Sequence, residues 1–165
     1  MMPPLSTIRL HLRPIALRDM KPINTVVQDP RFVQASTGCL MPQSDSQLLR
    51  WIMSQQKQHV SGSGCCYAIQ LAAVDDLIGL ISIQPQGNYA ELSFWLHPEY
   101  WRQGLMTEAL TAVINAWRNH HPASLITASC HINNPASQAL LKRVGMQLAE
   151  TDEIRQQQQY ALPDE

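Results

Sequence analysis

The stretch HPEYWRQGLMTEAL, residues 97–110, carries the chain from a predicted strand into a predicted helix through a single glycine, Gly104. The apolar run ELSFWL before it favours a strand. After Gly104, apolar residues recur at the spacing of an amphipathic helix. A helix that begins at a glycine presents unpaired N–H groups and the positive end of its dipole, which together attract an anion. The connection is therefore either a plain bend or a cradle for an anionic ligand.

The rest of the chain predicts one mixed α/β domain over residues 1–165, without internal repeats or linkers. Alternating and apolar runs predict strands at 7–15, 65–72, 77–84, 89–96, 124–130, 146–150 and 155–162. Helical spacing and capping residues predict helices at 19–28, 44–60, 104–119 and 134–144. Asp19 is expected to cap the first helix, and residues 29–42 to form an irregular connection. The apolar stripe expected on the second helix consists of Leu48, Leu49, Ile52 and Met53.

The composition disfavours several functional classes. A net charge of −1 gives no electrostatic footprint for nucleic acid or an anionic membrane surface. No segment has the apolar length of a signal peptide or a membrane span, so we expect a cytoplasmic protein. The cysteines have no chelating spacing, so we expect reduced, buried thiols and no metal site. They are Cys39, Cys65, Cys66 and Cys130.

Two motifs together favour the cradle over the bend. WRQGLM follows a predicted strand and opens a helix, and NNPASQALLKRVGM provides Asn134, Ser137, an apolar pair, two basic residues and Gly145. In this combination they resemble the GCN5-related N-acetyltransferase (GNAT) superfamily, whose first motif binds the pyrophosphate of acetyl-CoA. Almost the whole chain, from IRLHLRPIALRDM onward, is similar to the RimJ/RimL-like branch, which acetylates the N-termini of ribosomal proteins. The sequence departs from the pattern at Met106, where a small residue is usual, and at Met146, which replaces a Phe.

The resemblance implies an α/β (α+β) GNAT-like domain with a mostly antiparallel mixed sheet, flanked by about four helices. The fourth predicted strand is expected to carry a bulge and to splay from the fifth. Its residues Phe94, Trp95 and Leu96 would then line the pantetheine of acetyl-CoA, with the Leu96 N–H at the thioester carbonyl. The residues expected around the pyrophosphate are Arg102, Gln103, Gly104, Leu105, Met106 and Thr107. Asn134 and Ser137 are expected along the pantetheine.

The predicted chemistry is direct attack of a neutral amine on the thioester, which needs a base and an acid. Glu91 is the preferred base, although it also fits a plain glutamate near the end of a strand. Ser137 is the preferred acid for the leaving thiolate, although serine is also common in the first turn of a helix, and Asn134 suits a helix cap. Tyr160 is the substitute acid. Cys130 and His131 are strand neighbours that point to opposite faces, which disfavours a covalent acyl-enzyme.

The acceptor is less well specified by the sequence. By resemblance it is the N-terminal α-amine of a protein, with ribosomal proteins as candidates; the alternatives are a small amine, amino acid, polyamine or antibiotic. The alternative function is a non-catalytic acyl-CoA-binding regulatory domain. The acceptor pocket is expected between the first two helices, residues 29–43 and the turn near 150–153. Because that turn is short, the pocket is either open or completed by a second subunit in a homodimer. Glu108 is expected to be structural.

Overall fold

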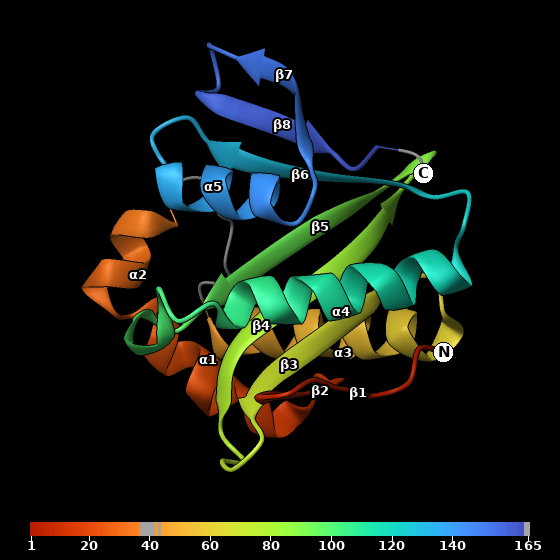
Figure 1. Ribbon diagram of the computed structural model, residues 1–165. Coiled ribbons are helices and arrows are strands. Elements are labelled where there is room, and N and C mark those ends of the chain that lie inside the picture. Colours follow the sequence, from red (N-terminus) through yellow and green to blue (C-terminus); the bar gives the residue numbers. More distant parts are fainter. Residues whose placement is uncertain (37–41, 43, 164–165) are drawn as a thin grey trace.

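The computed structural model describes residues 1–36, 42 and 44–163 and is shown in Figure 1. The helices are α1 (Met20–Val27), α2 (Pro30–Ala35), α3 (Asp45–Ser61), α4 (Leu105–His120) and α5 (Pro135–Arg143), with the 3₁₀ turns η1 (Leu17–Asp19) and η2 (Pro98–Tyr100). The strands are β1 (Leu5–Ser6), β2 (Leu10–Pro14), β3 (Cys65–Leu71), β4 (Leu77–Gln86), β5 (Tyr89–Leu96), β6 (Leu125–His131), β7 (Gln147–Asp152) and β8 (Gln157–Ala161).

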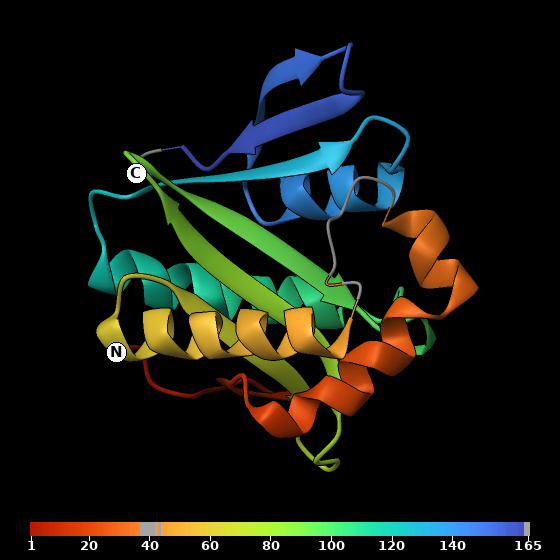
Figure 2. The ribbon, with the colours of Figure 1, turned by 180° about the vertical axis from the view of Figure 1, so that it is seen from behind.

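All the strands belong to one sheet, in the order β1-β2-β3-β4-β5-β6-β8-β7. Helices α4 and α5 cover one face, and α1 and α3 cover part of the other (Figures 1 and 2). The larger apolar core lies between the sheet and α4 and α5, and a smaller one lies under α1 and α3. Among the described strands, only β5 and β6 run parallel to each other. The predicted mixed, mostly antiparallel sheet is confirmed.

The splay in the sheet lies between β5 and β6, which are the fourth and fifth strands of the prediction. The two strands pair only from Tyr89 with Leu125 to Leu92 with Ala128. Beyond these pairs β5 continues to Leu96, whereas β6 stays paired with β8 as far as His131. The predicted bulge in β5 is wrong, because β5 and β4 pair in continuous register. The irregularity lies instead in the pairing of β3 with β4, near Ile69 and Gln70.

Helix α2 lies where the sequence predicted an irregular connection. Asp29 caps it by accepting a hydrogen bond from the Arg31 N–H at 2.9 Å, and Pro30 occupies its first position. The predicted connection also includes residues 37–41, which lie outside the described residues. Phe32 of α2 is buried against the rest of the molecule. The chain thus has five α-helices in its described ranges, one more than expected.

Two expectations about side chains near α1 and α3 are wrong in part. Asp19 stands at the start of α1 but does not cap it; its carboxylate binds the Arg13 guanidinium at 2.6 and 2.8 Å and the Ala16 N–H at 2.8 Å. On α3, Leu48 and Ile52 are buried as predicted, but Leu49 and Met53 are exposed. Gln55 and His59 take the remaining buried positions of α3. The buried stripe of α3 is therefore narrower and more polar than the sequence pattern indicated.

The cysteines differ in their surroundings. Cys65 and Cys66 are buried in β3; burial raises the pKa of Cys65 to about 12 and raises the pKa of Cys66 well above its ordinary value. Cys130 is free but only half-buried, and Cys39 lies outside the described residues. Within the described ranges, no helix combines the length and apolar character needed to cross a membrane.

Candidate functional site

The backbone of β5 turns two N–H groups into the gap left by the splay. The His97 N–H donates to the Ile78 carbonyl at 2.7 Å. Since alternate residues of an antiparallel strand bond to the same neighbour, Leu92, Phe94 and Leu96 direct their N–H groups toward β6. Of these, only Leu92 lies within the paired segment. The N–H groups of Phe94 and Leu96 therefore face the gap between the two strands.

Two contacts fix the backbone at the Leu96 end of the gap. The Trp101 indole N–H donates to the Leu96 carbonyl at 2.7 Å. Because this contact occupies the carbonyl, the N–H is the backbone group of Leu96 that faces the open gap. Gly79 of β4 lies opposite Leu96, and a Cβ at this position would come within 2.5 Å of the Trp95 carbonyl oxygen. Only glycine allows β4 to approach β5 so closely.

The N-terminus of α4 is open, as predicted for the cradle. Gly104 is the N-cap residue, with φ of 76°, and no side chain caps the helix. Arg102 also has a positive φ, of 59°, and the side chains of Arg102 and Gln103 are exposed. The first N–H groups of α4 are thus available to an anion at the positive end of the helix dipole. Met106, the unusual residue of the motif, packs into the core beneath α4, so its side chain does not occupy the space at the helix N-terminus.

The turn between β1 and β2 holds the N-terminus of α4 through contacts that the sequence did not suggest. Glu108 accepts hydrogen bonds from the Thr7 hydroxyl, the Arg9 backbone N–H at 2.9 Å and the Arg9 side chain at 2.8 Å. Arg9 also donates to the Gln103 carbonyl at 2.8 Å. Burial raises the pKa of Glu108, but the bonds from Thr7 and Arg9 outweigh it, so the net shift is downward. Glu108 is thus a structural anchor for the cradle.

The second motif places Asn134 and Ser137 at the N-terminus of α5. The Asn134 side-chain oxygen accepts a hydrogen bond from the Ser137 N–H at 3.1 Å, which confirms Asn134 as the helix cap. Its amide nitrogen donates to the Ala35 carbonyl at 3.1 Å, a contact with α2 that the sequence did not predict. Ser137 is half-buried, and its hydroxyl forms no hydrogen bond with the described residues. It lies on the α4–α5 side of the sheet.

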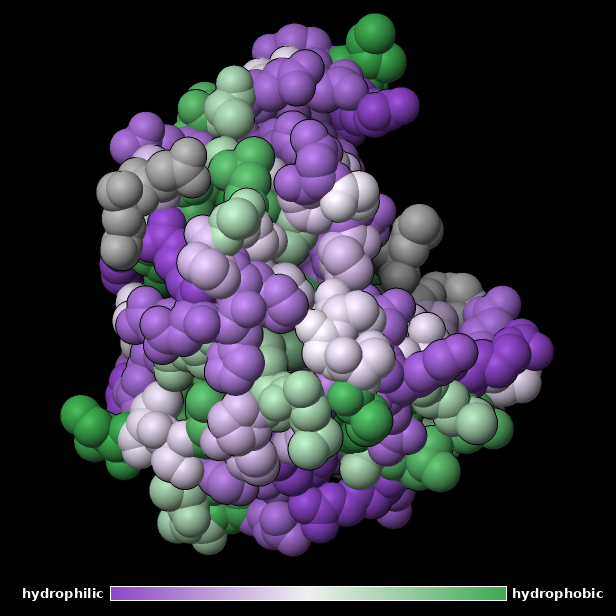
Figure 3. Space-filling view, turned by 90° about the vertical axis from the view of Figure 1, so that its right-hand side faces the viewer, coloured by the Kyte–Doolittle hydropathy of each residue, from purple (hydrophilic) through white to green (hydrophobic). Residues whose placement is uncertain are grey.

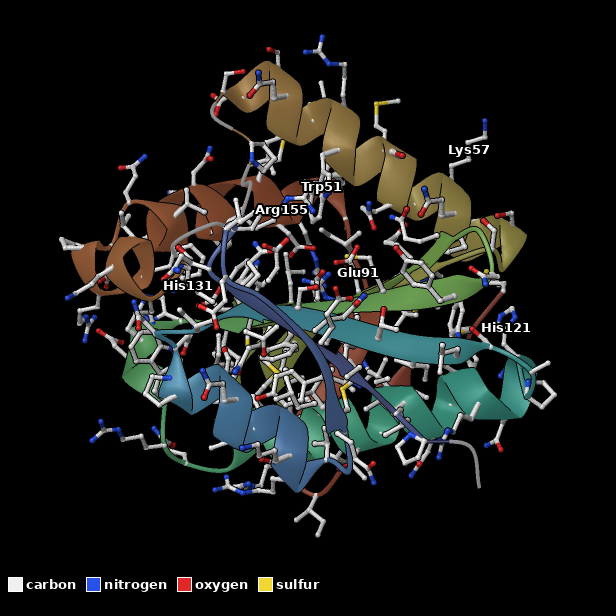
Figure 4. The ribbon with its side chains drawn as sticks, turned by 90° about the horizontal axis from the view of Figure 1, so that it is seen from above. Trp51, Lys57, Glu91, His121, His131 and Arg155 are labelled. Carbon is white, nitrogen blue, oxygen red and sulfur yellow. The ribbon has the colours of Figure 1, made fainter. Side chains whose placement is uncertain are left out.

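Glu91 lies on the opposite side of the sheet from Ser137. The neighbours Leu92 and Phe94 pack in the core with α4 and α5, and residues alternate along a strand, so Glu91 faces α3. Figure 4 shows Glu91 and Trp51 on this same side. Glu91 is half-buried, and its carboxylate forms no ion pair or hydrogen bond with any described residue. The arginine-paired alternative for Glu91 is therefore not observed in the described parts of the chain.

None of the described helices covers the α3 side of β6 and β8 (Figure 2). By the strand register, Ser129 and His131 of β6 share this face with Gln157 and Gln159 of β8. Figure 3 shows the outline of the molecule stepping inward between the upper strands and α3. The α3 face of β6 and β8 beside Glu91 is thus polar.

Tyr160 is less suited to proton transfer than Ser137. It is buried in the larger core, and its hydroxyl donates to the Gln158 side chain at 3.1 Å. Burial, with a smaller effect from Cys130, raises the pKa of Tyr160. Burial likewise raises the pKa of the Cys130 thiol. His131 points to the other face of β6 from Cys130, as the sequence indicated.

Two hollows on the described structure are distinct from the site of Glu91, Gly104 and Ser137. One hollow of about 360 Å³ lies between α1 and the start of α3, and another of about 360 Å³ lies near Tyr89 and His121, at the far end of β5. Neither is lined by Glu91, Gly104 or Ser137. Among the described residues, no group of three His, Cys, Asp or Glu side chains is placed to hold a metal ion.

Comparison with known proteins agrees with this geometry. Residues 9–147 match the family described as the acetyltransferase (GNAT) domain. The chain is 26% identical over 141 residues to the ribosomal-protein-serine acetyltransferase of Escherichia coli, which covers 82% of this chain and 78% of that protein. An acetyltransferase from Agrobacterium tumefaciens has the same fold, with a TM-score of 0.80, 22% identity, and coverage of 98% and 94% of the two chains.

The solved structure of RimL, a ribosomal-protein α-N-acetyltransferase in complex with coenzyme A, also has this fold. Its TM-score is 0.79 at 18% identity, and the match covers 98% of this chain and 97% of that chain. The family match spans most of the sequence and includes the strand and helix that form the open α4 N-terminus. The chain therefore belongs to the GNAT family of N-acetyltransferases.

Proposed function

We propose that this acetyltransferase takes its acetyl group from acetyl-CoA and transfers it directly to the N-terminal α-amine of a protein. The observation that carries the proposal is the gap between β5 and β6, into which the N–H groups of Phe94 and Leu96 point. The uncapped start of α4 at Gly104 lies after the same strand and provides donors for a pyrophosphate. RimL, which shares this fold, has been solved with coenzyme A bound.

The donor would lie along Phe94, Trp95 and Leu96, with its pyrophosphate near residues 102–107 and its sulfur toward Ser137. The Leu96 N–H would then stabilise the negative charge that develops on the thioester oxygen. Because the Leu96 carbonyl is already bound by Trp101 and Gly79 keeps β4 close, this N–H is held in a fixed direction. A preorganised donor costs little reorganisation when the charge forms.

Glu91 and Ser137 divide the proton transfers between the two faces of the sheet. Glu91 accepts the proton that the amine loses, directly or through water, on the face toward α3. The amine nitrogen forms the new bond to the acetyl carbon, and the bond from that carbon to sulfur breaks. Ser137 donates a hydrogen bond or proton to the leaving thiolate on the α4–α5 face. Neither the Glu91 carboxylate nor the Ser137 hydroxyl has a hydrogen-bond partner among the described residues, which supports these roles.

The open polar face beside Glu91 favours a peptide over a small amine as acceptor. An extended N-terminal segment has main-chain donors and acceptors that the amide side chains of Gln157 and Gln159 can satisfy. A small amine would instead need an enclosing pocket, and the two hollows of about 360 Å³ described above are not lined by Glu91. The name of the Escherichia coli relative, which acts on a ribosomal-protein serine, is consistent with this choice.

The test is release of free coenzyme A thiol from acetyl-CoA in the presence of different amines. The panel contains ribosomal-protein N-terminal peptides, the same peptides blocked at the α-amine, polyamines and aminoglycosides. We expect turnover with a free N-terminal peptide and none with its blocked form. Preferential turnover of a polyamine or an aminoglycoside would replace the acceptor assignment. No turnover and no thermal stabilisation with acetyl-CoA would overturn the whole proposal.

A further inference from the structure

Helix α2 bridges the two strands at the wide end of the gap. On the β5 side, the Phe32 ring meets Trp95 edge-on, with ring centroids 5.6 Å apart and an interplanar angle of 76°. On the β6 side, the Ala35 carbonyl accepts a hydrogen bond from Asn134, which follows β6 and caps α5. Figure 1 shows α2 at the edge of the molecule, between α1 and α5. These contacts set the position of α2 relative to both strands.

Asn134 uses both polar atoms of its side chain for protein contacts. Its oxygen accepts from the Ser137 N–H at 3.1 Å, and its nitrogen donates to the Ala35 carbonyl at 3.1 Å. Ala35 is the last residue of α2, where carbonyl groups lack a partner within the helix. One amide therefore caps the start of α5 and the end of α2. The oxygen has a second lone pair and the nitrogen a second N–H, so both bonds are compatible with the pantetheine contact that the resemblance implies for Asn134.

The aromatic pair held by α2 lies on the acceptor side of the sheet. Trp95 packs in the smaller core with α1 and α3, and it is four residues from Glu91 on the same strand face. Phe32 is 4% exposed and reaches the edge of the Trp95 ring. An amine that approaches Glu91 from the α3 side therefore passes near the Phe32–Trp95 pair, here called the aromatic wall, whose position depends on α2.

We propose that Asn134 is a positioning residue for the acceptor: it couples the cofactor-side helix α5 to α2 and so fixes the Phe32–Trp95 wall. The expected effect on catalysis rests on the proposed function. The inference goes beyond that function because it assigns an effect on acceptor binding to Asn134, a residue of the second motif. Asn134 touches neither the amine nor the acetyl group in this role, and it acts through the carbonyl of Ala35.

The variant Asn134→Ser separates the two bonds of the side chain. Serine keeps a side-chain oxygen that can cap the Ser137 N–H, but it is too short to donate to Ala35. We expect the KM for the peptide acceptor to rise about five-fold, the effect of one neutral hydrogen bond, while the KM for acetyl-CoA changes less than two-fold. The control is Asn133→Ser, the same substitution at the exposed neighbouring asparagine, which should leave both constants unchanged.

A second variant tests whether the effect travels through the aromatic wall. Phe32→Leu removes the edge contact with Trp95 and should also raise the peptide KM. If α2 connects the two residues, the double variant Asn134→Ser with Phe32→Leu will show less than the product of the single effects. Independent, multiplicative effects would overturn the coupling. A rise in the KM for acetyl-CoA alone would also overturn the inference, because it would indicate that Asn134 acts through contact with the pantetheine.

A readout without turnover keeps this inference separate from the proposed function. Hydrogen–deuterium exchange of the segment 29–36 should be faster in Asn134→Ser than in wild type and in Asn133→Ser, because α2 loses its C-terminal bond. If the wild type lacks activity but the exchange difference appears, the proposed function fails and the contact between α5 and α2 stands. Unchanged exchange in α2 would contradict the inference even in an active enzyme.

Discussion

Arg9 and Glu108, which are 99 residues apart in the sequence, are joined by two hydrogen bonds of 2.8 and 2.9 Å. Glu108 belongs to the first turn of α4, and Arg9 immediately precedes β2. The same arginine also holds the carbonyl of Gln103, next to Gly104. The pair therefore fixes the end of α4 at which an anionic ligand would bind, although neither side chain was expected to bind it.

The variant Glu108→Gln should lower the free energy of unfolding by about 2 kcal/mol at neutral pH, since it weakens hydrogen bonds to a charged group. The pKa of Glu108 is lowered in the folded protein, so its stabilising effect is complete above its ordinary value and is lost as the pH falls through the folded value. Urea denaturation at pH 7 and at pH 4 measures this. We expect the difference between wild type and variant to shrink at the lower pH; a difference independent of pH would contradict this assignment.

Replacing Gly104 by alanine should weaken acetyl-CoA binding about ten-fold. With φ of 76°, the new residue would carry strain of about 1 kcal/mol, and its Cβ would stand at the open start of α4. Gly87, with φ of 67° and open space around it, is the matched control for strain far from the site. Calorimetric titration should show weaker binding for Gly104→Ala and normal binding for Gly87→Ala. Equal affinities would mean that the ligand does not approach this turn.

The variant Glu91→Gln should reduce kcat by a factor of about 100 or more and leave the dissociation constant of acetyl-CoA unchanged. A neutral amide cannot accept the proton from the amine, and loss of a general base typically costs this much. Since Glu91 has no protein partner in the described structure, the substitution should also leave the melting temperature nearly unchanged. Steady-state kinetics with saturating peptide measures the effect, and full turnover would remove Glu91 from the mechanism.

Ser137→Ala and Tyr160→Phe should differ in their effects on kcat. We expect about a ten-fold loss for Ser137→Ala, because its half-buried hydroxyl has no partner among the described residues. Tyr160→Phe should keep kcat and lose about 1 kcal/mol of stability, because the phenol is buried and donates to Gln158. The reverse pattern in single-turnover rates would make Tyr160 the acid.

The fold was predictable from the sequence wherever local patterns and packing agree. The strand Tyr89–Leu96 has the predicted bounds, and the helix after Gly104 and the cap at Asn134 are also confirmed. Helix α2 was missed because its six residues have too short an apolar pattern, although Asp29 followed by Pro30 is a usual helix start. It also packs through Phe32 against Trp95, which is distant in sequence, and tertiary contacts of this kind stabilise short helices.

The site was predictable only for residues that belong to local motifs. Gly104, Asn134 and Ser137 stand in short patterns whose spacing is fixed by one helix. The contacts of Arg9 with Glu108 and of Asn134 with Ala35 each join residues 99 apart, and a single sequence contains no signal for such pairs. Gly79 was likewise not recognised, because its role depends on how closely β4 approaches Trp95.

The short pairing of β5 with β6 has a mechanical consequence. Four residue pairs between β5 and β6 provide the backbone pairing described between the strands β1–β5 and the strands β6–β8, so these two parts of the sheet are joined at one end. Acetyl-CoA bound between the two parts would also hold them together. Acetyl-CoA should then slow hydrogen exchange at Phe94 and Leu96 and stiffen the whole molecule, so that the substrate serves, while bound, as part of the framework.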